Sequence, residues 1–197
     1  MEGWEIVDKD INISNRRENG FSAIVFKKGN DIVIALRGTD GGVISENFKY
    51  LLSIYPHPQV QYLKNFIKKI ANSPYIDQNT KIYTTGHSLG GYLSLYAAAI
   101  IVENRNLHNC LEKAVTFATF GLNKFADKKA LDALYSLDPS NVKNYRIQGD
   151  VISCCGEFIT TPVTLNFPEP SSSVPKKVVL SHQIDQFFLC PFFRTFH

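Results

Sequence analysis

Two apolar runs rich in β-branched residues, at 21–27 and 31–37, are separated by the polar triplet Lys28-Gly29-Asn30. A short glycine-containing turn between two such runs predicts a β-hairpin. The second run is almost entirely apolar, which is typical of a strand that is covered on both faces. We therefore expect the second strand of this hairpin in the interior of a sheet.

From residue 31 onward the pattern alternates between strand-like and helical periods. Strands that alternate with helices favour an α/β fold with a mainly parallel central sheet, helices on both faces and an N-terminal antiparallel hairpin. The elements expected are helices at 45–52 (short), 58–71, 91–103 and 127–137 and a final helix carrying Ile184, Phe187 and Phe188, strands at 81–85, 113–119, 142–148 and 177–180, and a loop at 166–177.

Length and composition indicate one globular domain spanning residues 1–197. The chain has 44% hydrophobic and 20% charged residues, and a chain of this length buries roughly 70% of its unfolded surface. The net charge is only +3, and the sequence contains no basic stripe interleaved with aromatic residues, so we expect no nucleic-acid partner. A transient contact with a membrane surface is compatible with this charge.

Targeting signals are not evident in the sequence. The start is acidic and lacks the apolar core of a signal peptide, and no run approaches the roughly 20 apolar residues of a membrane-spanning helix. We expect a cytoplasmic location for the chain as given, with export by a signal-independent route left open. The cysteines Cys110, Cys154, Cys155 and Cys190 lack the spacing of a disulfide framework or a metal site, so we expect free buried thiols and no metal or other cofactor.

The pentapeptide Gly86-His87-Ser88-Leu89-Gly90 lies between the strand at 81–85 and the helix that follows it. A strand, a sharp turn with serine at its apex and a helix form the nucleophile elbow of α/β-hydrolases. Glycines are needed on both sides of the serine because larger side chains would collide with the strand and the helix. Ser88 is therefore the candidate nucleophile, and the competing interpretation is an ordinary glycine-rich turn.

A serine hydroxyl needs a base and an acid, which follow the serine along the chain in this fold. Asp150 comes directly after the strand at 142–148 and is the preferred acid, with Glu157 as the serious alternative. His182 follows the strand at 177–180 and is the preferred base. His57 is expected to be structural.

An oxyanion hole needs two donors near the nucleophile. The backbone N–H of Leu89, at the start of the helix, is the first candidate. Thr39 in the turn Arg37-Gly38-Thr39 is the second, because the turn ends a buried strand and Gly38 permits close approach.

Four segments together resemble the class 3 lipase family, in particular its compact bacterial members: 20–23, 34–39 (Ile-Ala-Leu-Arg-Gly-Thr), 85–91 (Thr-Gly-His-Ser-Leu-Gly-Gly) and 145–151 (Tyr-Arg-Ile-Gln-Gly-Asp-Val). The resemblance spans about residues 20–185. It implies Ser88 as nucleophile, Asp150 as acid, His182 as base, and Thr39 and Leu89 at the oxyanion hole. One departure is that residues 40–48 lack the tryptophan that is usual in the lid of family members.

The function expected is a serine ester hydrolase that cleaves carboxylic esters of acyl lipids, as a lipase or phospholipase A does, through an acyl-enzyme. Two alternatives stay open. A small-ester carboxylesterase or thioesterase would use the same residues, and a non-catalytic binding or effector module could retain the fold.

Overall fold

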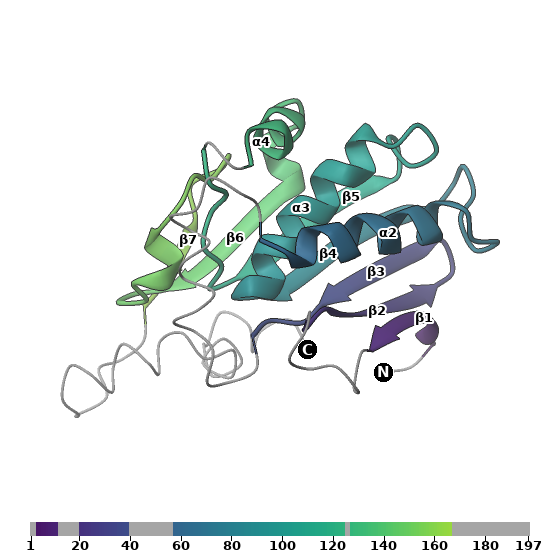
Figure 1. Ribbon diagram of the computed structural model, residues 1–197, viewed down its shortest axis with the longest axis horizontal. Helices are drawn as coiled ribbons and strands as arrows, with labels where there is room; N and C mark the ends of the chain where they lie inside the picture. Colours follow the sequence, from purple (N-terminus) through teal and green to yellow (C-terminus); the bar gives the residue numbers. More distant parts are fainter. Residues whose placement is uncertain (1–2, 12–19, 40–56, 125–126, 167–197) are drawn as a thin grey trace.

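The computed structural model describes residues 3–11, 20–39, 57–124 and 127–166. These residues form a seven-stranded sheet whose strands follow one another in chain order, with helices packed against it (Figure 1). The elements are β1 Glu5–Ile11, β2 Ser22–Lys28, β3 Asp31–Leu36, α2 Gln59–Ala71, β4 Lys81–His87, α3 Leu89–Glu103, β5 Leu111–Phe117, α4 Lys128–Tyr135, η1 Pro139–Asn141, β6 Val142–Ile147, η2 Ile152–Cys154 and β7 Val163–Leu165.

β1 pairs antiparallel with β2, and β2 pairs antiparallel with β3, whereas every pairing from β3 to β7 is parallel. The predicted hairpin is confirmed as β2 and β3, and Gly29 supplies the positive φ of 58° in the turn between them. β1 was not predicted, because its charged and exposed positions do not alternate cleanly with apolar ones. β7 was also missed, since three residues are too few for a periodic signal.

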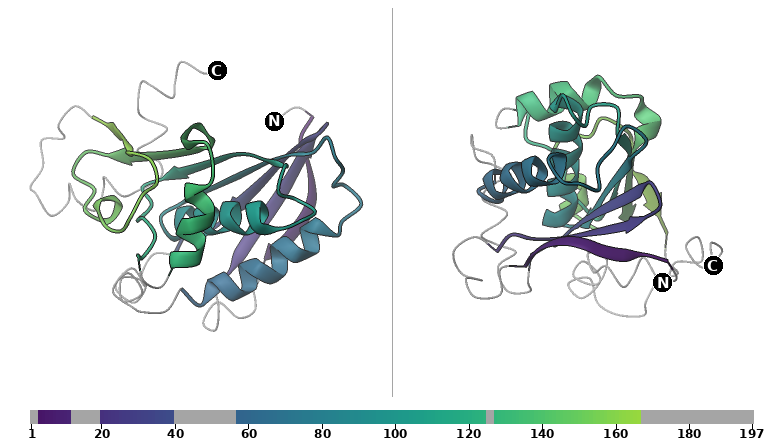
Figure 2. Two further views of the ribbon diagram at one scale, coloured as in Figure 1. Left: turned by 90° about the horizontal axis from the view of Figure 1, so that it is seen from above. Right: turned by 90° about the vertical axis from the view of Figure 1, so that its right-hand side faces the viewer.

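The helices α2, α3 and α4 cover the same face of the sheet (Figure 2). α2 packs against α3, and α3 packs against α4. Topology explains this arrangement, because parallel strands added in one direction by right-handed crossovers place every crossover helix on one side. The helix expected at Ile184, Phe187 and Phe188 lies outside the described residues, so helical cover of the second face stays a prediction.

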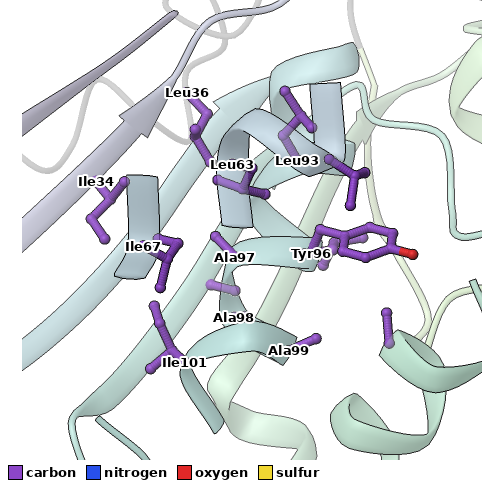
Figure 3. Packing of buried hydrophobic residues seen from close by; sticks show 14 of the residues in the cluster. Ile34, Leu36, Leu63, Ile67, Leu93, Tyr96, Ala97, Ala98, Ala99 and Ile101 are labelled. Atoms are coloured by element: carbon purple, nitrogen blue, oxygen red, sulfur yellow. The ribbon is translucent and has the colours of Figure 1, made fainter. Parts of the chain in front are cut away.

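Helix α3 is the centre of the core. It is apolar almost all round, and Ala97, Ala98 and Ala99 are buried, which allows the helix to approach the sheet closely. Figure 3 shows its side chains gathered with those of α2 and β3 in one cluster. Each fully buried leucine or isoleucine in such a cluster stabilises the fold by about 1.5–3 kcal/mol. The helix that carries Ser88 at its N-terminus is therefore held from several sides.

The helices and strands predicted between residues 58 and 148 are all confirmed, with ends shifted by a few residues. The predictions at 45–52 and 177–180, and all but the first residue of the loop at 166–177, fall outside the described residues. None of the helices in the part of the chain that the structure describes has the length and apolar character to cross a membrane.

Candidate active site

Ser88 lies at the junction of β4 and α3 with φ 55° and ψ −123°. This backbone conformation is unusual for a residue with a side chain, and strained residues of this kind persist where the surrounding structure holds them, often at functional sites. Ser88 occupies the N-cap of α3, yet its hydroxyl does not cap the helix as an N-cap serine ordinarily does. The turn predicted from the sequence is therefore present, with serine at its apex.

The glycines around Ser88 are required by backbone contacts. A Cβ atom at Gly86 would lie 2.2 Å from the carbonyl oxygen of Gly90, and one at Gly90 would lie 2.2 Å from the carbonyl oxygen of Leu36. A Cβ at Gly38 would lie 2.6 Å from the carbonyl oxygen of His87. Atoms this close must move apart, so the end of β4, the start of α3 and the turn after β3 can meet only through glycine.

The end of β5 holds the backbone of Ser88 in place. The Ser88 N–H donates to the Phe117 carbonyl at 3.0 Å. The Ser88 carbonyl accepts from the Thr119 hydroxyl at 3.2 Å and from the first-turn N–H groups of Gly91 and Tyr92. Both polar backbone groups of the strained residue are thus satisfied, which fixes the direction in which its side chain leaves the turn.

Ala118, beside this clamp, is the second residue other than glycine with a positive φ among the described residues, at 46°. It is fully buried, and its N–H donates to the Tyr145 carbonyl of the next strand at 2.8 Å. Neither Ala118 nor Thr119 was expected at the site from the sequence. Their place directly after a strand in the interior of the sheet, next to the strand of the elbow, was the available signal.

The two candidate oxyanion donors lie at the same junction. Leu89 is the first residue of α3, and no acceptor for its N–H is found within the described ranges. N–H groups in a first helical turn are available to an anionic ligand. Gly38, the neighbour of Thr39, lies against the elbow, since a Cβ built on it would be 3.6 Å from Ser88 Cβ. The structure therefore brings the Thr39 turn to Ser88 and Leu89.

Asp150 follows β6, whose carboxyl end lies at the same edge of the sheet as the ends of β4 and β5. The residue is 1% exposed, and its carboxylate accepts the Ile152 N–H at 3.0 Å. Gly149, immediately before it, has φ 87°, as expected for a turn that no other residue adopts readily. The alternative acid, Glu157, accepts instead from the hydroxyl of Tyr135 on α4 at 2.8 Å.

His182 lies outside the described residues, so its role as the base stays a prediction. His57 is buried, its Nδ1 accepts the Gln59 N–H at 3.2 Å, and burial lowers its pKa to about 4. A neutral, hydrogen-bonded imidazole at the start of α2 agrees with the structural role expected for it.

A buried carboxylate that sequence reasoning did not single out stabilises the helix of the elbow. Asp127 is 1% exposed and accepts the hydroxyls of Tyr92 and Tyr96 at 3.1 Å each and the N–H of Asn123 at 2.8 Å. Burial raises its pKa, and the three donors oppose that shift. The network joins the first two turns of α3 to the residues that precede α4.

A seven-stranded mixed sheet with a strained serine between β4 and α3 defines the lipase-like α/β-hydrolase fold. Lipase II from Rhizopus niveus superposes with a TM-score of 0.53 at 15% sequence identity, over 77% of this chain and 60% of that one. Lower scores are found for M37 lipase (0.47, 20% identity, 76% of this chain and 56% of that one) and the Rhizomucor miehei lipase propeptide complex (0.48, 17%, 77% and 50%). The chain thus spans between half and about three fifths of the length of these structures.

Residues 5–140 match the model of the Mbeg1-like family, and the chain belongs to this family. The match includes the Thr39 turn and the Ser88 elbow and ends before Asp150 and His182. No curated protein matches the sequence. The expected resemblance to lipases is therefore supported as a similarity of fold, through lipase II from Rhizopus niveus at 15% identity.

Proposed function

We propose that this protein is a serine ester hydrolase acting on carboxylic esters of acyl lipids. The observation that carries the proposal is the conformation of Ser88, whose unfavourable φ is maintained by glycine contacts on three sides and by hydrogen bonds to both its polar backbone groups. Strain of this kind has a use in a nucleophile, because it presents the hydroxyl above the carboxyl edge of the sheet. A simple connection between a strand and a helix would not need it.

In the proposed reaction Ser88 Oγ attacks the acyl carbonyl while His182 takes its proton. Asp150 holds the imidazole in the required tautomer and stabilises its charged form. The negative charge that develops on the carbonyl oxygen is met by the N–H of Leu89 and by Thr39. His182 then protonates the leaving alcohol. In the second half of the reaction His182 takes a proton from water, which attacks the acyl carbonyl, and His182 returns the proton to Ser88 Oγ as the acid leaves.

The arrangement of donors supports this proposal energetically. The Leu89 N–H is fixed by the helix behind it, and the Gly90 contact with Leu36 and Gly38 fixes the distance between the helix and the Thr39 turn. Donors that are already in position cost no reorganisation when the charge forms, and losing one such donor typically lowers turnover by about 10²–10³-fold.

The test is hydrolysis of nitrophenyl esters from acetate to palmitate, together with triacylglycerol, lysophospholipid and diacyl-phospholipid. Ser88→Ala, Asp150→Asn and His182→Asn should each lower kcat by about 10⁴-fold or more. Two matched controls should retain activity. Ser136→Ala removes a serine that only caps the end of α4, and Glu157→Gln neutralises the alternative acid.

Chain-length dependence separates the ester classes. Rates that rise with acyl length support a lipid substrate, whereas activity limited to short esters or thioesters would replace this substrate with a small one. No hydrolysis by the well-folded protein on any substrate would overturn the proposal and favour a binding module that retains the fold.

A further inference from the structure

Cys154 and Cys155 are adjacent residues at the end of η2, the short helix that follows Asp150. The expectation of buried thiols is confirmed for Cys110, but Cys154 is exposed and Cys155 is half-buried. Their thiols donate to carbonyls of successive residues: Cys154 Sγ to Asp150 at 3.3 Å, and Cys155 Sγ to Val151 at 3.5 Å. Both sulfur atoms therefore lie over the same turn of backbone, and one is open to solvent.

A positive charge lies beside the exposed sulfur. Arg146 Nη1 is 3.7 Å from Cys154 Sγ, and the guanidinium is fixed because Arg146 Nε donates to the Thr164 hydroxyl of β7 at 2.9 Å. The thiolate is the reacting form of cysteine, and cations beside exposed thiols favour its reactions. Cysteines that respond to peroxide combine exposure, such a cation and a neighbouring thiol that can resolve the first product.

We propose that Cys154 and Cys155 form a reversible redox site that takes hydrogen peroxide. The Cys154 thiolate attacks a peroxide oxygen, the O–O bond breaks, and the released hydroxide leaves as water after taking a proton. The Cys155 thiol then attacks the resulting sulfenic acid, forming the S–S bond and releasing a second water. Two thiol hydrogens are lost, and one peroxide is reduced to two waters.

The bond between adjacent cysteines must distort the backbone. Consecutive Cα atoms are about 3.8 Å apart, whereas disulfide-linked Cα atoms are usually about 4.4–6.8 Å apart. Such a bond is easily reduced, which makes the site reversible. The distortion falls on the turn in which the Cys154 N–H donates to Val151 and the Cys155 N–H donates to Ile152.

Asp150 is part of the same turn. Its carboxylate accepts the Ile152 N–H at 3.0 Å, and its carbonyl accepts from the Ser153 hydroxyl at 3.2 Å and from the Cys154 thiol. Oxidation should therefore displace the proposed acid and lower ester hydrolysis. This consequence rests on the proposed function, whereas the chemistry of the two thiols does not.

The experiment treats the chain of residues 1–197, as wild type and as Cys190→Ser, with hydrogen peroxide and maps the cysteines by mass spectrometry. We expect the loss of two hydrogen atoms from the peptide that holds Cys154 and Cys155, restored by dithiothreitol, with Cys110 unreacted. In Cys155→Ser the reaction should stop at a sulfenic acid on Cys154 that dimedone traps. Arg146→Gln should slow this step several-fold, and Lys143→Gln, which removes an exposed cation of the same strand, should not.

Two results would overturn the proposal. One is a Cys154 that remains a thiol in the folded protein at a peroxide dose that oxidises it in urea. The other is a bond from Cys154 to Cys190 in the wild type. Ester hydrolysis is followed in parallel: a reduced protein without activity would refute the proposed function, while the mass result would still decide the redox site.

Discussion

Gly90→Ala tests whether the turn after β3 and the start of α3 must touch for the site to form. A Cβ at this position would lie 2.2 Å from the Leu36 carbonyl oxygen, 2.8 Å from the Arg37 carbonyl carbon and 2.9 Å from the Gly38 nitrogen. All three atoms are backbone, so no side-chain rotation relieves the overlap. Real Cβ contacts essentially never fall below 3.0 Å, so the two segments must separate by at least 3.0 − 2.2 = 0.8 Å.

The separation affects both stability and activity. Overpacking of this kind costs about 1–3 kcal/mol, and the absence of any flexible atom places Gly90→Ala near the upper limit, at about 3 kcal/mol. For a domain of this size that is a fall in Tm of about 6–12 °C. The same movement draws the Leu89 N–H away from Thr39, and a displacement near 1 Å lowers turnover by about 10²-fold.

The assay is thermal unfolding followed by circular dichroism, with ester hydrolysis measured well below the transition. Gly29→Ala is the matched control, because nothing lies within 4 Å of its Cβ position. Its loss of stability comes only from placing alanine in the left-handed backbone conformation, with φ 58°, and amounts to about 1–2 kcal/mol. That variant should keep full activity. If Gly90→Ala unfolded no earlier than Gly29→Ala and retained its turnover, the close packing of the Thr39 turn on the elbow would be refuted.

Three further variants test the groups that support the site. His57→Gln should flatten the pH dependence of stability. The folded pKa of His57, about 4, lies below the ordinary 6.5, so the wild-type stability is complete above pH 6.5 and falls by about 3 kcal/mol in total as the pH drops toward 4. A variant whose stability changed between pH 7 and pH 4.5 by as much as that of the wild type, measured by denaturation, would contradict this. Asp127→Ala leaves the hydroxyls of Tyr92 and Tyr96 and the N–H of Asn123 without their acceptor. Urea denaturation should therefore show a free energy of unfolding lower by about 3 kcal/mol or more. A decrease below about 1 kcal/mol would be incompatible with the network. Thr119→Val removes the donor to the Ser88 carbonyl, and we expect a loss of about 1 kcal/mol in stability with a lower kcat at unchanged KM, whereas a changed KM alone would indicate a role in substrate binding.

Much of the fold could be predicted because the signals were local. The hairpin around Gly29 and the amphipathic helix at 59–71 are specified by residues that are near one another in sequence. β1 and β7 could not be predicted this way. β1 is an edge strand whose pairing with β2 depends on residues more than ten positions away, and β7 is three residues long.

The site divides in the same manner. The elbow carries its own signature, since the glycine contacts that require it come from the same short segment and the turn at Gly38. Ala118, Thr119 and Asp127 act through contacts made only after folding, when β5 and the segment before α4 come to lie against α3. An ordinary threonine or aspartate carries no sequence pattern that distinguishes it from a surface residue.

Labelling with a fluorophosphonate probe measures whether Ser88 is an activated nucleophile in the folded protein. We expect one covalent adduct per folded chain, mapped by mass spectrometry to Ser88, absent after urea denaturation and in Ser88→Ala, and retained in Ser136→Ala. A folded protein that takes no label, or takes it at a different serine, would contradict this expectation.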